Sequence, residues 1–306
     1  MTLSVCFGGR AAVSLRAMAT APSRREKLYR AYMTFFERAE RTRRWSVFDD
    51  IPWDELRRSR PDPELAWGAE TFCAVEMYLP DYTAAGVNVV RDSFGQAWFQ
   101  ANWAYEESKH SLVLREYLLR SGSRSEEQFA AFEHEILSKT WRPPFATARQ
   151  MTCYGALQEA TTRLLYLKQR AAATGAGDRV LERIYWLIAR DEAAHAGFYE
   201  TVLRVEIEDD RAGVLRDLDH VFTHFRMPAD DLVPDYDRRV AGLRRAGVDR
   251  HVFLRDVWLR LLARLGVSRA DVARTRRSAK APDLDSDTPL TDAVLDARRP
   301  GTAAGC

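Results

Sequence analysis

Apolar residues recur every three or four positions over long stretches of the chain, which is the spacing of one face of an α-helix. One inward face consists of the apolar residues Trp103, Leu114 and Tyr117 together with Glu107 and His110, and in chain order the five are spaced at intervals of 4, 3, 4 and 3. The pattern predicts four core helices: one that begins at Pro63 and three that cover roughly 95–120, 145–170 and 179–206. No segment shows a convincing strand pattern, so we expect an all-α fold.

Residues that start or end helices mark these boundaries. Asp62 is a suitable N-cap for the first core helix, and Pro80 should kink or end it. Gly122 should end the second core helix, and a glycine-containing break at 175–177 should separate the third from the fourth. The pattern also predicts flanking helices near 24–44, 124–139, 210–226, 232–246 and 250–265.

Two of the core helices carry the same short motif, a glutamate followed three residues later by a histidine. The pairs are Glu107 with His110 and Glu192 with His195. Each pair lies on one helix face, one turn apart, and can direct a carboxylate and an imidazole at the same point. Glu76 precedes the first pair by 31 residues and Glu159 precedes the second by 33, so the chain repeats one order of residues in two halves.

This set of side chains predicts a metal centre. Carboxylate and imidazole together suit iron, manganese or zinc, and four carboxylates balance the charge of two divalent ions. Without metal, four carboxylates in a bundle core would face a large desolvation and repulsion cost. Four helices that carry these groups inward form the di-iron site of a ferritin-like bundle. One Glu-x-x-His motif can occur harmlessly on a surface helix, but two with matched glutamates are much harder to obtain by accident.

Composition bounds the organisation of the chain. With 306 residues and 46% hydrophobic content, it can form one large domain or two small ones. We expect a flexible segment over 1–22, a di-iron helical domain over 23–270 and a disordered tail over 271–306. The four cysteines are scattered without a Cys-x-x-Cys pair, which favours a reducing compartment. No apolar run is long enough to span a bilayer.

The net charge is only +2, but the basic residues are unevenly distributed. Residues 1–44 hold ten Arg or Lys against three Glu, and a second basic cluster lies within 238–250. Such runs are usually solvated helix faces, although they can also receive an acidic partner. Nucleic acid is not an expected partner, because the sequence contains no nucleic-acid-binding motif.

Residues 1–22 contain no Asp or Glu and are rich in Ser, Ala and Arg, as in an organellar transit peptide. A flexible bacterial N-terminus, or a true start at Met18, is the alternative that we favour. The expected location is therefore the bacterial cytoplasm, or the plastid stroma if residues 1–22 are a transit peptide.

Five short segments are informative when they are taken together in chain order. They are EMYLPDY from Glu76, WAYEESKH from Trp103, QEATT from Gln158, IARDEAAH from Ile188 and FRMP from Phe225. Together they resemble the soluble acyl-acyl-carrier-protein (acyl-ACP) desaturases over about residues 25–265. The resemblance implies a ferritin-like di-iron bundle with additional flanking helices, usually a homodimer.

The resemblance also implies a role for each candidate residue. The iron ligands would be Glu76, Glu107, His110, Glu159, Glu192 and His195. Among them, Glu107 and Glu192 match the ligands that bridge both irons. Trp45, His110 and Asp191 match a hydrogen-bonded chain that carries electrons inward, and Thr162 matches a threonine beside the oxygen site.

The residues outside the ligand set each have a second interpretation. A metal-bound histidine normally donates its other nitrogen to a carboxylate or carbonyl, which supports Asp191, but this residue could also lie on the surface of its helix. Thr162 is one turn beyond Glu159 and could instead bond to its own helix. Trp45 could simply pack.

The implied reaction inserts a cis double bond into a saturated acyl chain on ACP, with two Fe²⁺ ions, O₂ as co-substrate and ferredoxin as electron donor. The chain departs from the family at Met77, Ser111 and Ala196, which replace an acid, a glycine and a glutamate next to ligands. Acyl chain length and double-bond position depend on the pocket and stay open.

Three rival functions share the helical bundle. The first is a di-iron hydroxylase or N-oxygenase of a small molecule, which product analysis separates from a desaturase. The second is a non-catalytic iron-storage bundle, although this chain has several helices beyond the four that storage needs. The third is the small subunit of ribonucleotide reductase, with a radical at Tyr154 or Tyr199.

Overall fold

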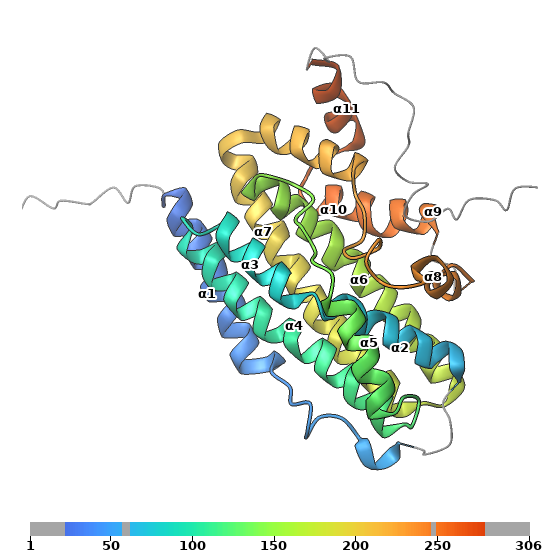
Figure 1. Ribbon diagram of the computed structural model, residues 1–306. Helices are drawn as coiled ribbons and strands as arrows, with labels where there is room; N and C mark the ends of the chain where they lie inside the picture. Colours follow the sequence, from blue (N-terminus) through green and yellow to red (C-terminus); the bar gives the residue numbers. More distant parts are fainter. Residues whose placement is uncertain (1–21, 57–61, 246–248, 279–306) are drawn as a thin grey trace, which may run out of the picture.

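The computed structural model describes residues 22–56, 62–245 and 249–278, and all regular structure in these ranges is helical, as predicted. Long helices packed side by side form the centre of the molecule (Figure 1). These central helices are α2 (Pro63–Glu76), α3 (Leu79–Val89), α4 (Phe94–Arg120), α6 (Ala148–Ala176) and α7 (Arg179–Thr223). The flanking helices are α1 (Arg24–Arg38), α5 (Glu126–Leu137), α8 (Tyr236–Arg245), α9 (Arg250–Phe253), α10 (Leu259–Arg264) and α11 (Arg269–Ser278). Three short turns of π- or 3₁₀-helix are η1 (Ala39–Arg43), η2 (Trp53–Glu55) and η3 (Leu254–Trp258).

Capping residues fix the ends of the central helices where the sequence indicates. The Asp62 side chain accepts a hydrogen bond from the backbone N–H of Glu64 at the start of α2, and Asp178 accepts one from Leu181 at the start of α7. Gly122 and Gly177 adopt a φ of +72°, which favours glycine, after α4 and α6 respectively.

Pro80 breaks the first core helix, as predicted, and α3 follows α2 after two residues. Glu76 is consequently the last residue of α2. At the interruption, the backbone carbonyl of Val75 accepts the N–H of Tyr78 at 3.3 Å and the hydroxyl of Tyr82 at 3.0 Å. The break thus places Glu76 at a helix end whose last turn is supported by both a backbone and a side-chain donor.

Two helices are longer than their sequence patterns indicate. α6 continues through Gly175 to Ala176, and α7 absorbs most of the separate helix predicted at 210–226. Asp210 interrupts α7 with φ −144° and ψ 73°, and its side chain accepts a hydrogen bond from the N–H of Gly213. Asp210 therefore acts as an internal N-cap that restarts the helix after a kink.

The predicted disordered tail begins too early. Residues 271–278 belong to α11, in which Val272 is buried and Asp271 pairs with Arg211 of α7. The apolar stripe of this segment is too short to be seen in the sequence, but packing against α7 stabilises the helix. Residues 1–21 of the predicted flexible segment 1–22, and the tail beyond 278, lie outside the described residues.

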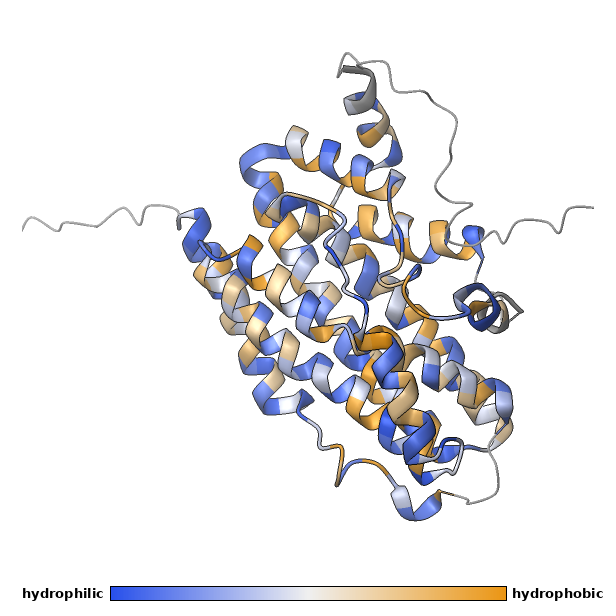
Figure 2. Ribbon diagram, in the orientation of Figure 1, coloured by the Kyte–Doolittle hydropathy of each residue, from blue (hydrophilic) through white to orange (hydrophobic). Residues whose placement is uncertain are grey.

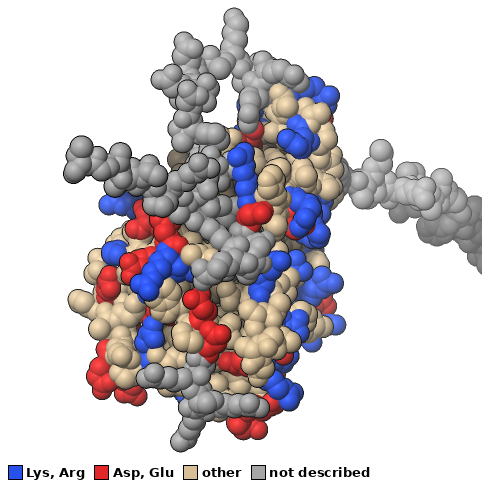
Figure 3. Space-filling view, turned by 90° about the vertical axis from the view of Figure 1, so that its right-hand side faces the viewer, with Lys and Arg blue, Asp and Glu red and all other residues tan. Residues whose placement is uncertain are grey.

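Most cations of the first basic cluster are used within the chain. Those that pair with carboxylates are Arg24, Lys27, Arg30, Arg41, Arg43 and Arg44. Figure 3 shows the side of the molecule opposite α1, and on its coloured part Lys and Arg side chains lie among Asp and Glu rather than forming one continuous basic surface. Among the described residues of this cluster, Arg24, Lys27, Arg43 and Arg44 thus anchor α1 and the turn after it to the bundle.

The helices are amphipathic, and hydrophilic and hydrophobic residues alternate around each ribbon (Figure 2). Within the described ranges, no helix combines the length and the apolar character that a bilayer crossing requires.

Candidate metal centre

The structure brings all six predicted ligand residues together in the bundle core. Glu76 comes from the end of α2, Glu107 and His110 from the middle of α4, and the remaining three from α6 and α7. Each of the six is at most 6% exposed. The helix periodicity explains the convergence, since each Glu-x-x-His pair occupies one inward face.

The six residues form two overlapping groups, in each of which one potential ligand atom per residue lies within 4.8 Å of the others. The first group is Glu76, Glu107, His110 and Glu192. The second group is Glu107, Glu159, Glu192 and His195. Glu107 and Glu192 belong to both groups, so two cations bound here would share these two carboxylates. Their roles as ligands remain a prediction.

Both histidines direct Nδ1 into the cluster. His110 Nδ1 lies 3.1 Å from Glu107 Oε2 and 3.6 Å from Glu192 Oε1. His195 Nδ1 lies 2.9 Å from Glu107 Oε1 and 3.3 Å from Glu159 Oε2. The Nε2 atoms point away from the cluster, which leaves Nδ1 of each ring available to a metal.

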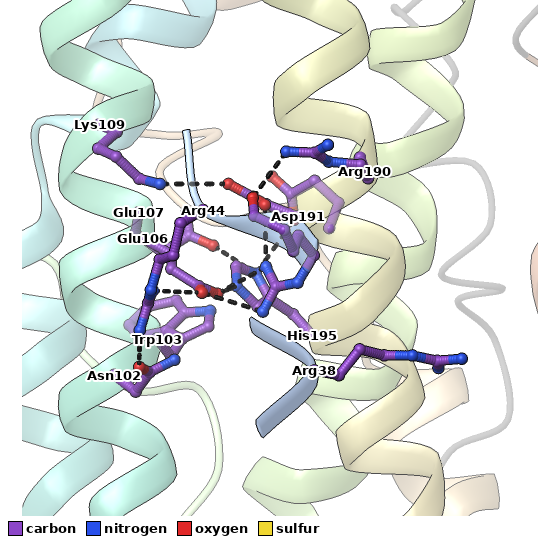
Figure 4. Close-up of polar contacts among 12 residues, drawn as sticks. Arg38, Arg44, Asn102, Trp103, Glu106, Glu107, Lys109, Arg190, Asp191 and His195 are labelled. Carbon is purple, nitrogen blue, oxygen red and sulfur yellow. Dashed lines mark hydrogen bonds and ion pairs between the residues drawn. The ribbon is translucent and has the colours of Figure 1, made fainter. Parts of the chain in front are cut away.

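Two further carboxylates face the outer nitrogens of the histidines. Asp191 is fully buried, and its Oδ2 lies 3.6 Å from Nε2 of His110, just beyond hydrogen-bond distance. The indole of Trp45 donates to the same oxygen at 2.7 Å, so the predicted series of three residues is contiguous in space. Glu106 lies 2.8 Å from Nε2 of His195 and occupies the matching position in the other half (Figure 4).

Sequence reasoning assigned no role to Glu106, although the sequence holds a signal for it. An acidic residue directly precedes the ligand glutamate in both motifs: Glu106 before Glu107 and Asp191 before Glu192. In the structure, each of these acids faces the histidine of the opposite helix. The complete repeated motif is therefore an acid followed by Glu-x-x-His.

Other side chains hold the ligand glutamates in place. The hydroxyl of Tyr166 donates to Oε1 of Glu76 at 2.7 Å, and the indole of Trp103 donates to Oε1 of Glu159 at 3.1 Å. Thr162 donates its hydroxyl to the carbonyl of Gln158 on its own helix at 3.0 Å, which was one of its two interpretations. Thr162 also lines the cavity described below, so it is not only a helix-bonding residue.

Burial and mutual repulsion shift the protonation of the cluster. Burial, reinforced by the charge of Glu107, raises the pKa of Glu76 to about 8. Burial alone would lower the pKa of His110, but the adjacent Glu107 and Asp191 carboxylates raise it to about 10. Burial and the charge of Glu107 also raise the pKa of Glu192 well above its usual range. Without a metal, protons must therefore compensate part of the charge.

The unpartnered oxygens of Glu192 show that the cluster fits a metal. Both are buried and have no hydrogen-bond partner among the described residues. A buried carboxylate without donors is costly, and cations placed among the six residues would supply the missing interaction. The oxygen and imidazole donors are those preferred by divalent transition metals.

A long cavity adjoins the cluster. Its empty volume is about 1140 Å³, with open solvent at its mouth included, and Glu76 and Glu107 form part of its wall. Most of the lining area is apolar. Gly155 lies against the ring of Tyr199 on this wall, where a Cβ atom would come within 2.7 Å of the ring. The cavity can therefore hold an extended apolar ligand next to the metal site.

Fold and site together define a helical bundle with a buried carboxylate–histidine cluster that fits a metal and an adjoining apolar cavity. Residues 73–273 match the family described as fatty acid desaturase, and this chain belongs to that family. The resemblance stated from the sequence is thus confirmed.

Individual proteins agree with the family. The chain is 24% identical over 241 residues to DesA1 of Mycobacterium tuberculosis, which is provisionally named an acyl-ACP desaturase; the match covers 71% of this chain and 70% of DesA1. Acyl-ACP desaturase 4 of rice (Oryza sativa subsp. japonica, chloroplastic) is 32% identical over 118 residues, which cover 38% of this chain and 28% of the rice protein. The fold is similar to the X-ray structure of M. tuberculosis DesA2, with a TM-score of 0.60 and 15% identity over 83% of this chain and 99% of DesA2.

Proposed function

We propose that the chain is an acyl-ACP desaturase that inserts a cis double bond into a saturated acyl chain. The observation that carries the proposal is the junction of the two ligand groups with the cavity. Glu107 belongs to both groups and also lines the cavity wall. An acyl chain in the cavity would thus pass directly beside the metals. The names of the relatives from M. tuberculosis and rice support ACP as the carrier of the substrate.

Two Fe²⁺ ions would occupy the two ligand groups, with Glu107 and Glu192 shared between them. Iron with O₂ supplies the oxidising power to take hydrogen from a methylene, which no side-chain base can deprotonate. In the overall balance, the acyl chain loses two hydrogens, and these reduce O₂ to two waters together with two electrons and two protons. We propose ferredoxin as the source of these electrons.

The side chains of the protein position the reactants. The apolar cavity wall would hold the acyl chain extended and exclude water from the reaction. Asp191 and Glu106 would orient the rings of His110 and His195, so that each Nδ1 faces a metal. Thr162, on the wall beside the ligands, could offer its hydroxyl to oxygen after rotation away from the Gln158 carbonyl.

The docking surface for acidic ACP is better sought in the second basic cluster than in the first. Most described cations of the N-terminal cluster are already paired. In the second cluster Arg239 pairs with Glu70, but Arg238 is exposed on α8. α8 also contributes Tyr236 and Val240 to the cavity wall. A carrier bound there would be close to the space that its acyl chain must enter. The bacterial relatives fit the expected cytoplasmic location of this reaction.

We also propose that the chain forms a homodimer through the outer face of α4. Phe94, Trp98, Tyr105 and Leu112 are each 53–55% exposed. Intervals of 4, 7 and 7 place these residues on one face of the helix. Sedimentation of the wild-type chain should give a dimer, and Trp98→Glu combined with Tyr105→Glu should give a monomer. A monomeric wild-type chain would contradict this part of the proposal.

The decisive experiment measures metal and product on the same sample. The chain is reconstituted anaerobically with Fe²⁺, iron per chain is determined, and stearoyl- and palmitoyl-ACP are analysed by mass after turnover with ferredoxin and O₂. Two irons and a product lighter by two hydrogens support the proposal. Two irons with an added oxygen, or with no acyl product, would replace it with an oxygenase of the same fold.

Ligand variants test the metal site separately. Glu107→Ala and His195→Ala should abolish iron binding and leave helical content largely intact. Glu116→Ala is a matched control, since Glu116 lies on the same helix and pairs with Arg120 near the surface. Two irons per chain in both ligand variants would refute the assignment.

A further inference from the structure

Arg43 is buried between two carboxylates, and its side chain is only 6% exposed. Nη1 donates to Oε2 of Glu106 and to Oδ1 of Asp191, at 2.8 Å in both cases. Nη2 donates to Oε1 of Glu106 at 2.9 Å. One guanidinium therefore joins α4, which carries Glu106, to α7, which carries Asp191.

Each of these carboxylates faces a different histidine. Glu106 lies 2.8 Å from Nε2 of His195, and Asp191 lies 3.6 Å from Nε2 of His110. The contacts cross between helices: Glu106 of α4 faces His195 of α7, as Figure 4 shows, and Asp191 of α7 faces a histidine of α4. Arg43 is thus the point where the two halves of the site meet on the side away from the ligand atoms.

We propose that Arg43 is a positioning residue that couples the two halves of the metal centre, so that the two metals bind as a pair. The inference rests on the metal site of the proposed function. By holding Glu106 and Asp191 relative to each other, the guanidinium fixes the ring planes of both histidines through their Nε2 atoms. Loss of Arg43 should consequently disturb both halves at once.

Charge compensation alone does not require Arg43. Arg44 donates to Glu106 at 2.7 Å and Lys109 lies 3.9 Å from Asp191, so each carboxylate has a second cation. Among the described side chains, however, only the guanidinium of Arg43 contacts both carboxylates. A lysine ammonium is a point charge and does not reproduce the planar fork that binds two groups simultaneously.

The backbone around Arg43 is shaped for this role. α1 continues into the π-helical turn η1, and three successive side chains, from Arg43 at the end of this turn to Arg44 and Trp45 after it, contact Glu106 or Asp191. Nη2 of Arg190 donates to the backbone carbonyl of Arg43 at 2.6 Å and fixes the end of the turn. Single π-helical turns often occur at functional sites.

The test uses Co²⁺ as a probe on the metal-free full-length chain. Calorimetric titration measures the affinity of each equivalent, and the hyperfine-shifted N–H resonances of the two histidines report the two halves separately. Arg43→Met should weaken both equivalents about tenfold or more and move both resonances. Of the two carboxylates, Arg44 contacts only Glu106, besides Glu40 and Asn102, so Arg44→Met should move one resonance.

The matched control is Arg41→Met, which breaks only the exposed pair with Glu37 in the same turn and should change neither resonance. Arg43→Lys separates coupling from charge and should stay weakened. Full recovery by the lysine, or a change confined to one histidine, would overturn the coupling. If Arg43→Met does not fold by circular dichroism, Arg43→Gln provides the same comparison.

The outcomes separate this inference from the proposed function. A wild-type chain that binds fewer than two Co²⁺ would overturn the metal site and the coupling together. Two equivalents in the wild-type chain with unchanged affinities in Arg43→Met would overturn the coupling alone.

Discussion

The two ends of the helical bundle, on either side of the ligand cluster, are built differently. Towards the N-terminus of α7, the core is filled by aromatic rings: the ring centroid of Tyr166 lies 4.5 Å from that of Phe72 and 5.7 Å from that of Tyr185. Towards the N-termini of α4 and α6, the core encloses the cavity, and the small residues Gly155 and Thr152 lie on its wall among aromatic rings such as that of Tyr199. The cluster lies at the boundary between them.

Because the two ends differ, one bundle can combine a stable core with a cavity for a ligand. Apolar burial at the packed end holds together the four helices that carry the candidate ligands, so the other end can leave a cavity open. Thr152, Gly155 and Thr162 of α6 add little side-chain volume to the wall of this space. Substitutions at the two ends should therefore differ in what they damage.

The largest expected effect is the loss of stability in Leu181→Ala at the packed end. Leu181 is fully buried in the aromatic and aliphatic core. Truncation should lower the free energy of unfolding by about 2–5 kcal/mol, because the removed methyl groups leave a void that rigid neighbours cannot fill. Denaturant unfolding measures the change, and iron per folded chain should be unaffected.

Leu165→Ala is the matched substitution at a position of the same apolar cluster that borders the cavity. Leu165 already faces empty space on one side, so its truncation should cost about 2 kcal/mol, at the low end of the same range. Equal losses for the two leucines would contradict the contrast between filled positions and positions that face the cavity. Leu181→Met, which conserves volume, should cost less than about 1.5 kcal/mol.

The second expected effect is a pH dependence of metal affinity, which arises in the cluster between the two ends. In the metal-free fold the pKa of Glu76 is raised from 4.5 to about 8, so its stabilising contribution is present below pH 4.5 and is lost as pH rises to 8. A metal must displace this proton, so its affinity should increase about tenfold per pH unit for each displaced proton up to that pH.

Thermal unfolding with and without Mn²⁺ at pH 6, 7 and 8 measures this effect. The stabilisation by metal should grow with pH, and Glu76→Gln, which carries no titrating carboxyl, should reduce the growth. A metal-induced shift that is constant from pH 6 to 8 would show that the glutamate is already ionised in the free protein.

The sequence was most informative where one local rule decided the outcome. Helix period and spacing placed six ligands on inward faces, and Asp62, Pro80 and Gly122 set helix boundaries through capping and backbone chemistry. It was least informative where distant residues interact. The role of Glu106 depends on a histidine 89 residues away and that of Arg43 on Asp191 148 residues away, and α11 depends on packing against α7. Such contacts follow from tertiary packing, which periodicity does not report.

The third effect is expected from Gly155→Ala at the end that encloses the cavity. An added Cβ would come within 2.7 Å of the Tyr199 ring, which must move into the cavity. Overpacking should cost about 1–3 kcal/mol of stability, and the longest acyl chains should bind less well. Comparison of myristoyl-, palmitoyl- and stearoyl-ACP measures the change in chain-length preference. Unchanged preference would place the acyl chain elsewhere.

The smallest expected effect is that of Tyr166→Phe, which acts where the packed end meets the cluster. The ring of Tyr166 is part of the aromatic core, and its hydroxyl donates to Glu76 at 2.7 Å. Phenylalanine preserves the ring packing and removes only this hydrogen bond. Metal affinity should therefore fall about tenfold, the smaller of the losses expected when a residue that hydrogen-bonds a metal ligand is changed. Titration with Co²⁺ measures the change.

Tyr185→Phe is the control, because the Tyr185 hydroxyl has no hydrogen-bond partner within the described part of the chain. If both variants lower the metal affinity equally, the aromatic core acts on the cluster through ring packing. The hydrogen bond from Tyr166 to Glu76 would then not be the cause.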